Sequence, residues 1–351
     1  MSGRMPRIAG AAGLLTLVLL VLACTGGDYV LSVLTTAMVF AVAGIGLSLL
    51  GGTLRVVNLG ASAFIGTGAF TAAYCNQVLG ADIVLSLLAA MASCVVLGGL
   101  VAPVASRLNG IYMAIITVGV AFLAQYVFRL ATPWTGGVAG VQITSVSFLG
   151  HDLLQPVEIG PVTLSSARAI FIVAAVLLVL VATTSTTLLK SRIGRAWFTV
   201  GESPITARSF GINPTSYRAL AIVHSSALAG LGGGMLALTS GFVSWDQFDL
   251  VMGVNLLAVV VLGGLGSVYG VIAASAVLYT LPVLVSKGSS FIPLVTTDLT
   301  RSGLSPEQFT TVLYGVALVF VMVLEPGGFA AIMRRARIRI SHQLAHHERN
   351  A

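Results

Sequence analysis

The chain has 351 residues, of which 57% are hydrophobic and 8% charged, and its formal net charge at pH 7 is +7. Because soluble domains carry about 25% charged residues, a chain this poor in charge cannot cover a surface that faces water. The composition therefore excludes a soluble enzyme and predicts an all-α polytopic membrane protein.

Ten apolar runs approach the length of a membrane span, since a helix needs roughly 20 apolar residues to cross the hydrocarbon core. The sequence therefore predicts a bundle of about ten transmembrane helices. In chain order, the predicted spans are 8–24, 29–50, 58–75, 83–105, 111–131, 167–189, 218–240, 250–264, 268–286 and 308–325. The first run follows Arg4 and Arg7 and ends in a faint lipoprotein cleavage box. We interpret it as a retained helix, and a cleaved signal is the alternative.

The basic residues orient these spans, because cytoplasmic loops of membrane proteins are rich in Lys and Arg. With both termini inside, the inside segments hold most of them, namely Arg4, Arg7, Arg55, Arg107, Lys190, Arg192, Arg195, Arg208 and the arginines of the C-terminal tail. The outside segments hold Asp28, Asp82, Asp152, Glu158, Asp246, Asp249, Asp298 and Glu307. Membrane orientation thus explains the positive charge, and no nucleic-acid partner is expected.

Two glycine-rich stretches, at 58–75 and 262–279, lead into helices of small residues. Many transporters consist of inverted repeats, in which interrupted segments at matching positions line the path. The second to fifth and the seventh to tenth spans would form such halves. The third and ninth spans both run outward, however, so they are not mates in that scheme. The inverted repeat therefore stays an open alternative.

The cytoplasmic loop 190–217 contains the pattern of a short helix that ends in a turn. Residues 202–210 predict an amphipathic helix, since Pro204 is tolerated in a first turn and Glu202 suits the positive N-terminal end. Gly211 would end this helix in the left-handed conformation. A short helix here is a candidate docking element, and an ordinary solvated loop is the alternative. The candidate residues are Glu202, Ile205, Ala207, Arg208, Phe210, Gly211 and Asn213.

Polar residues at membrane depth are candidates for lining a transport path, because polar groups are costly there. An interhelical hydrogen bond is the alternative for each of them. The path candidates are Asn58, Ser62, Thr67, Thr117, Gln125 and Asn255. The glycines expected to permit close packing are Gly60, Gly66, Gly68, Gly263, Gly264 and Gly266. We find no grouping of His, Asp and Cys that predicts a catalytic or metal site.

An ordered set of motifs resembles the ABC permeases for branched-chain amino acids, in the LivM-like branch of that family. The set comprises the 202–213 segment with Gly211-Ile212-Asn213, the glycine-rich 259–267, the early segment 59–69, the middle segment 110–117 with 135–137, and Pro326-Gly327-Gly328. Each motif is short, but together they follow the family order over roughly 29–330. The resemblance therefore covers most of the chain.

The resemblance implies a transmembrane subunit of an importer that moves small solutes inward, first among them branched-chain amino acids. Such a subunit is no enzyme and binds no cofactor, and the chain has no phosphate-loop motif. Two partner ATPases would use ATP with Mg, and the 202–211 helix would couple to them. The further partners implied are a second permease in a heterodimer and an extracytoplasmic solute-binding protein.

The resemblance also implies a location in the bacterial cell membrane, surrounded by lipid. We expect three parts: a first helix with a short outer loop at 1–28, the permease domain at 29–330, and a basic cytoplasmic tail at 331–351. The sequence departs from the family where ionisable residues are common, because it has Ala61, Phe122 and Asn255 there. The substrate therefore stays open to urea or short amides. An ion-coupled transporter or channel is the alternative class, although such proteins more often carry buried charges.

Overall fold

The computed structural model describes residues 13, 15–23, 26–108, 111–148, 151–153, 155, 157–159 and 162–288, with isolated positions 312, 315, 316, 328, 329 and 331. Apart from these isolated positions, the predicted tenth span and the basic tail lie outside the described residues. The predicted first span is described only in part, as a helical stretch at 15–23.

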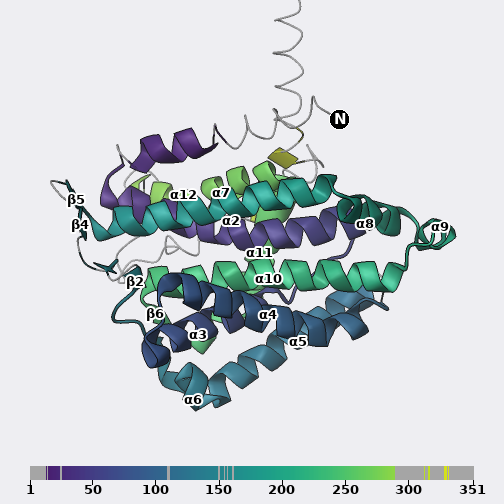
Figure 1. The fold of residues 1–351 in the computed structure, drawn as a ribbon, viewed down its shortest axis with the longest axis horizontal. Helices are drawn as coiled ribbons and strands as arrows, with labels where there is room; N and C mark the ends of the chain where they lie inside the picture. Colours follow the sequence, from purple (N-terminus) through teal and green to yellow (C-terminus); the bar gives the residue numbers. More distant parts are fainter. Residues whose placement is uncertain are drawn as a thin grey trace, which may run out of the picture.

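Long helices run along one axis of the molecule and pack side by side (Figure 1). The longer helices are α2 (Asp28–Leu54), α3 (Ala61–Leu79), α4 (Ile83–Ala105), α5 (Ile111–Leu130), α7 (Ser166–Lys190), α10 (Pro214–Ser240), α11 (Leu250–Gly263) and α12 (Val268–Gly288). Each predicted span from 29–50 to 268–286 coincides with one of these helices. Among the described residues, α2, α4, α5, α7 and α10 are long and apolar enough to cross a membrane. The predicted helical membrane bundle is confirmed.

Short elements gather at the two ends of the bundle. One end carries α8 (Arg192–Glu202) and α9 (Pro204–Ser209). The other carries α6 (Thr132–Thr135), η1 (Gly137–Ala139), η2 (Trp245–Phe248) and three antiparallel strand pairs. The pairs are β1 (Val141–Gln142) with β6 (Phe242–Val243), β2 (Ser147–Phe148) with β3 (His151–Asp152), and β4 (Val157–Ile159) with β5 (Val162–Leu164). Strands this short leave no alternation in the sequence to predict them from.

Helices α2, α3 and α10 form the centre because small residues let their backbones meet. A Cβ on Gly68 of α3 would overlap the carbonyl of Gly230 of α10, and one on Gly46 of α2 would come within 2.9 Å of the Ser225 carbonyl oxygen. Close backbone packing of this kind replaces the hydrophobic drive that is missing between helices in lipid. The outer helices α4, α5 and α7 expose apolar side chains instead.

A buried cluster shows which helix termini share an end. Leu50 near the end of α2, Ala105 at the end of α4, Met113 at the start of α5 and Ile222 near the start of α10 pack around Trp197 of α8. Helices α2 and α4 therefore run toward this end and α5 and α10 run away from it, as the predicted order of inside and outside loops requires.

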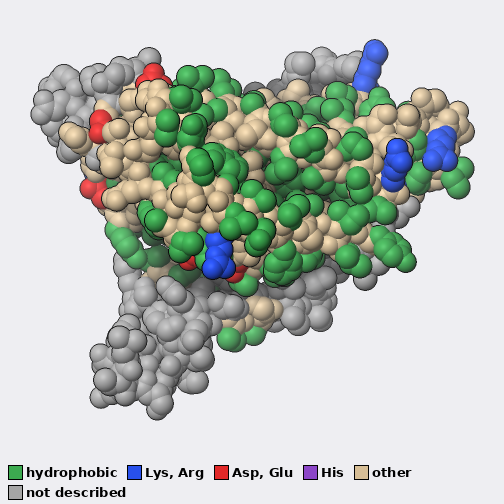
Figure 2. Space-filling view, turned by 90° about the horizontal axis from the view of Figure 1, so that it is seen from below, with side chains coloured by type: hydrophobic (Ala, Val, Ile, Leu, Met, Phe, Trp, Pro, Cys, Tyr) green, Lys and Arg blue, Asp and Glu red, His purple; other side chains and the backbone are tan. Residues whose placement is uncertain are grey.

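Charge distinguishes this end from the opposite one. Figure 2 shows Lys and Arg side chains at the end that carries α8 and α9, while most visible Asp and Glu side chains lie toward the other end. We call these the basic end and the acidic end. Hydrophobic side chains cover much of the face between them, as expected of a surface that meets lipid.

Candidate functional site

Two regions combine unusual backbone structure with predicted functional residues. The first is the α8–α9 element, residues 192–209, at the basic end. The second is the 55–60 segment, which joins α2 to α3 without helical structure.

The α8–α9 element consists of two helices, where the sequence predicted one over 202–210. Ser191 caps α8, since its Oγ accepts from the backbone N of Ile193 at 3.2 Å. Ser203 caps α9 in the same way, with its Oγ 3.2 Å from the N of Thr206. Because Pro204 has no N–H and fits the first helical position, the chain restarts there. The predicted start was therefore wrong, and Glu202 is the last residue of α8.

Helix α8 is fixed to the bundle by one aromatic side chain and one glycine. The Trp197 ring is buried, and its Nε1 donates to the carbonyl oxygen of Tyr217 on α10 at 2.9 Å. A Cβ on Gly201 would overlap the carbonyl oxygen of Thr53, so the end of α8 touches the end of α2 backbone to backbone. A displacement of the end of α8 toward α2 would therefore push directly on the backbone of α2.

Helix α9 and the residue after it expose apolar side chains at the surface of the basic end. Ile205 is 80% exposed and Phe210 74% exposed, whereas Ala207 between them is fully buried against the bundle. Arg208 is exposed on the same short helix. Figure 1 shows α9 as the outermost element of the basic end. The element thus combines a buried anchor with an exposed apolar surface.

The turn after α9 has the form that its sequence predicts. Gly211 adopts a φ of +74°, and its N donates to the carbonyl of Arg208 at 2.9 Å. The N of Ile212 donates to the carbonyl of Ala207 at 2.9 Å, which closes the helix end. Asn213 then caps α10, because its Oδ1 accepts from the N of Thr215 at 3.1 Å. The structure therefore places Gly211 and Asn213 in the turn and Ile205, Arg208 and Phe210 at the surface.

The 55–60 segment enters the bundle as non-helical chain. Helix α3 begins at Ala61 and not at residue 58 as predicted. The Sγ of Cys94 lies 3.0 Å from the carbonyl oxygen of Phe64 in the first turn of α3. Cys94 precedes the end of α4 at Ala105 by 11 residues, which is about 16 Å at 1.5 Å per residue. Helix α3 thus starts well inside the membrane-spanning part.

Side-chain oxygens replace the helical hydrogen bonds that this segment lacks. The N of Leu59 donates to Oγ1 of Thr117 at 3.1 Å, and the N of Gly60 donates to Oδ1 of Asn58 at 2.9 Å. Asn58 and Thr117 are both buried. In the described part of the chain, the backbone N–H groups of Val56 and Val57 have no hydrogen-bond partner. Buried polar groups at membrane depth require partners, which explains why Asn58 and Thr117 stand here.

The side chain of Val57 is 46% exposed although it precedes this buried turn. Non-helical backbone at membrane depth is tolerated only where protein or a water-filled cavity covers it. The open face of the 55–60 segment is therefore unsuited to lipid. It needs water or a neighbouring protein.

Ser62 lies in the first turn of α3 and is fully buried, and its Oγ has no hydrogen-bond partner among the described residues. A Cβ on Gly253 of α11 would come within 3.7 Å of this oxygen and 2.6 Å of the Leu59 carbonyl. The start of α11 therefore packs against the turn at Leu59 to Ser62. Asn58, Ser62 and Thr117 are brought together at this point.

The other path candidates are placed differently. The hydroxyl of Thr67 donates to the carbonyl of Ala63 at 2.8 Å, within its own helix. Gln125 on α5 and Asn255 on α11 are partly exposed, and no hydrogen bond of their side chains occurs within the described residues. Phe122 is exposed on α5, and Ala61 is buried at the start of α3. These residues do not join the Asn58 group through a hydrogen bond.

Four of the six predicted glycines lie where neighbouring atoms leave no room for a side chain, namely Gly60, Gly66, Gly68 and Gly263. A Cβ on Gly60 would overlap the Thr117 carbonyl, one on Gly66 would overlap Phe128, and one on Gly263 would come within 2.7 Å of Val271. Gly264 and Gly266, in the turn between α11 and α12, adopt φ values of +93° and +82°. The N of Gly266 donates to the carbonyl and Oγ of Ser48, at 3.1 and 3.0 Å, which ties this turn to α2.

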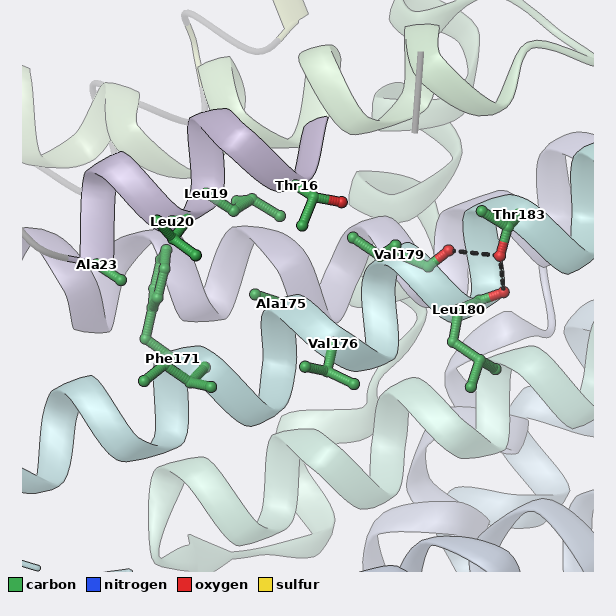
Figure 3. Close-up of a pocket in the computed structure, with 11 residues that line it drawn as sticks. Thr16, Leu19, Leu20, Ala23, Phe171, Ala175, Val176, Val179, Leu180 and Thr183 are labelled. Atoms are coloured by element: carbon green, nitrogen blue, oxygen red, sulfur yellow. Dashed lines mark hydrogen bonds between the residues drawn. The ribbon is translucent and has the colours of Figure 1, made fainter. Parts of the chain in front are cut away.

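A separate cavity of about 680 Å³ lies between the 15–23 helix and α7 (Figure 3). Its walls are hydrocarbon except for Thr16 and Thr183, and the Thr183 hydroxyl donates to the Val179 carbonyl at 2.8 Å. An amino acid carries an ammonium and a carboxylate that need polar partners. This groove therefore does not suit a polar solute, unlike the surroundings of Asn58.

No group of three His, Cys, Asp or Glu side chains able to hold a metal ion occurs in the described residues. Sequence reasoning missed Trp197, Ser203 and Arg55 as parts of the site. Ile193, Trp197 and Val200 have the spacing of an amphipathic helix, and Ser203 before Pro204 is a helix-start signal. These two patterns therefore indicate Trp197 and Ser203 from the sequence alone. No pattern in the sequence indicates a role for Arg55.

Residues 29–322 match the family model described as branched-chain amino acid transport system / permease component. Two curated relatives are named high-affinity branched-chain amino acid transport system permease protein LivM, one from Salmonella typhimurium strain LT2 and one from Escherichia coli strain K12. Each is 30% identical over 321 residues, which cover 86% of this chain and 69% of the relative. No solved structure matches the chain.

Proposed function

Because this chain belongs to the family of permease components of branched-chain amino acid transport systems, we propose that it lines part of the inward path of an ABC importer. A permease component implies partner subunits. In this proposal they are two cytoplasmic ATPases, a second permease that pairs with this chain as a heterodimer, and an extracytoplasmic solute-binding protein. The ATPases bind and hydrolyse ATP with Mg, whereas this chain binds no cofactor and catalyses no reaction.

The exposed apolar surface of α9 is the observation that carries the proposal. Ile205 on the six-residue helix α9 and Phe210 directly after it protrude from the basic end, and the buried Ala207 anchors the helix. Exposed apolar patches rimmed by polar residues mark protein interaction sites. The positive-inside rule assigns the basic end to the cytoplasm, where the ATPases work. Helix α9 is therefore the coupling helix in our proposal, with Arg208 at its rim.

The orientation follows from the same rule. Chain termini on the cytoplasmic side of the bacterial inner membrane leave the acidic end facing outward. The strand pairs and α6 then form the outer surface on which the solute-binding protein docks. Short paired strands suit this role because they hold a loop in one shape.

The transport path runs along the open face of the 55–60 segment in this proposal. Water or the second permease covers that face, because lipid cannot satisfy its backbone. Asn58, Ser62 and Thr117 supply neutral polar groups there, and the Ser62 hydroxyl has no partner among the described residues. Thr67, Gln125 and Asn255 belong to the outer reaches of the path.

Branched-chain amino acids are the proposed solutes because both curated relatives are named for them. Urea or short amides are the alternative within the same family, since the Asn58 group carries no charge to select an amino acid. Uptake of leucine and of urea by liposomes that contain the complete transporter would distinguish the two. Leucine uptake that depends on ATP and on the binding protein is expected, and urea uptake alone would overturn the assignment.

The coupling surface is tested by co-purification of the ATPases from cells that express the whole transporter. Ile205→Asp and Phe210→Asp should each lower the recovered ATPase about tenfold or more, as for buried hydrophobic anchors of an interface. Val138→Asp is the matched control, because Val138 is equally exposed and apolar but lies at the acidic end. Full ATPase recovery with both α9 variants would remove α9 from the coupling role.

A further inference from the structure

One ion pair connects the two regions of the candidate site. Nη2 of Arg55 lies 2.5 Å from Oε1 of Glu202, although the two residues are 147 positions apart in the chain. Arg55 is the first residue after α2, and Glu202 is the last residue of α8. The pair therefore joins the start of the 55–60 segment to the end of the helix that precedes α9.

The backbone of Arg55 is unusual. Its φ of +55° is left-handed, and among the described residues it is the only non-glycine residue with a positive φ. Glycine is the usual residue at this position after a helix, because a Cβ makes the left-handed conformation less favourable. A glycine here would relieve the strain, yet it would remove the partner of Glu202. Strained residues that persist in this way cluster at functional sites.

The residues around the pair also join the end of α8 to the end of α2. Gly201, next to Glu202, lies against the Thr53 carbonyl two residues before Arg55. On the far side of the junction, Ser203 caps α9 and Asn58 caps the turn at Gly60. Both partners of the ion pair are about two-thirds exposed, 67% and 68% of the side chain. Pairs this exposed contribute little to stability, so removal of this pair should leave the bundle folded.

From these contacts we propose that the Arg55–Glu202 pair positions the 55–60 segment in response to α9, and so transmits the state of the ATPases to the transport path. This inference rests on the proposed function. Movement of α9 displaces Glu202 through the short Ser203 link, and Glu202 carries Arg55 with it. Because Arg55 is the first residue of the segment that holds Asn58 at membrane depth, its displacement moves that segment and so changes the path. Arg55 and Glu202 are positioning residues in this scheme, since neither contacts the solute.

The test uses the complete transporter in liposomes and measures solute imported per ATP hydrolysed. Arg55→Glu and Glu202→Arg should each lower this ratio roughly tenfold, which is within the usual range of coupling between two sites. The double variant, which reverses the pair, should recover at least half of the ratio. A purely structural role would lower uptake and ATP hydrolysis together, and the reversed pair would not restore the ratio.

Two further variants separate coupling from folding and from general charge effects. Arg55→Gly should keep or raise the thermal midpoint, because glycine prefers this backbone conformation, while it lowers the import ratio. Arg107→Glu makes the Arg55→Glu charge change at another exposed position of the basic end, and it should leave the ratio unchanged. Normal import per ATP in Arg55→Gly would overturn the proposal.

The outcome for the pair is distinguishable from the outcome for the proposed function. If Ile205→Asp loses the ATPases while Arg55→Gly imports normally, α9 is the coupling helix and the ion pair is not its link. If the wild-type complex shows no ATP-dependent import, the proposed function itself fails.

Discussion

Two breaks in helical structure adjoin the end of α2, and they are held in different ways. The turn between α11 and α12 is held mainly by backbone, since Gly266 approaches Gly52 closely and its N donates to the Ser48 carbonyl, with the Ser48 Oγ as a second acceptor. The 55–60 segment is held by side chains, through Asn58 and Thr117. A backbone contact between glycines has no alternative arrangement, whereas side-chain hydrogen bonds can exchange partners. The first break therefore suits a fixed scaffold, and the second suits a moving part.

Replacement of Gly52 should have the largest effect, because it breaks the fixed side of this comparison. In Gly52→Val, the new side chain would overlap the backbone of Leu265 and Gly266. We expect a loss of more than about 4 kcal/mol of stability, as for severe overpacking at a backbone contact. Thermal denaturation and the yield of monodisperse protein in detergent measure it.

The matched control is Gly99→Val on α4, where a Cβ meets no atom within 4 Å. Its thermal midpoint should stay near that of the wild type. Equal midpoints for Gly52→Val and Gly99→Val would show that the turn at Gly266 is not rigidly packed.

Thr117→Val tests the side-chain attachment of the 55–60 segment with a smaller expected effect. Valine keeps the shape of threonine but leaves the buried N–H of Leu59 without an acceptor, which costs about 1–3 kcal/mol. Solute uptake should fall with the midpoint, because the segment loses its position beside α5. The control is Thr184→Val, since the Thr184 hydroxyl donates only within its own helix. A Thr117 variant with normal midpoint and uptake would contradict the attachment.

Asn58→Ala should have a smaller effect on stability, about 1 kcal/mol, because it removes a local cap on the N of Gly60. Uptake should fall more than stability does, since Asn58 also lies on the proposed path. Asn255→Ala is the comparison, because the Asn255 side chain makes no hydrogen bond within the described residues. The order of effects would be reversed if Asn255, and not Asn58, were the side chain that the solute meets.

Cysteine labelling should reveal motion with the least disturbance of the fold. In a background without Cys24, Cys75 and Cys94, Val57→Cys and Leu265→Cys place one thiol at each break, and both native side chains are partly exposed. Substitutions at such exposed sites change stability by less than about 0.5 kcal/mol. A water-soluble maleimide should label Val57→Cys at a rate that changes severalfold with ATP, and Leu265→Cys at a constant rate. ATP-independent labelling at both positions would remove the contrast between the breaks.

The sequence predicted the helices well because apolar length and charge placement are local signals. The predicted span 83–105 coincides with α4, and the span 167–189 differs from α7 by one residue at each end. The start of α3 was predicted three residues early, since no charged residue separates Asn58-Leu59-Gly60 from the apolar helix that follows. The left-handed residue that ends α2 is an arginine, and only Gly or Asn would have signalled it.

The candidate site could be predicted in outline only. The exposed helix with Ile205 and Phe210 follows from the loop pattern, as does the stop at Gly211. The pairing of Glu202 with Arg55 depends on how α8 packs against α2, and no local pattern contains that contact. The joining of Asn58 with Thr117 is likewise a property of the bundle, because Asn58 lies in the 55–60 segment and Thr117 lies on α5.

The β1–β6 pair has a consequence for biogenesis. Val141 pairs with Val243 and Gln142 with Phe242, so the first strand must wait for its partner while α7, α8, α9 and α10 are synthesised and inserted. The loop between α5 and α7 can therefore close only when α10 and β6 are in place. The time at which this loop becomes resistant to protease during synthesis would then show when α10 has inserted into the membrane.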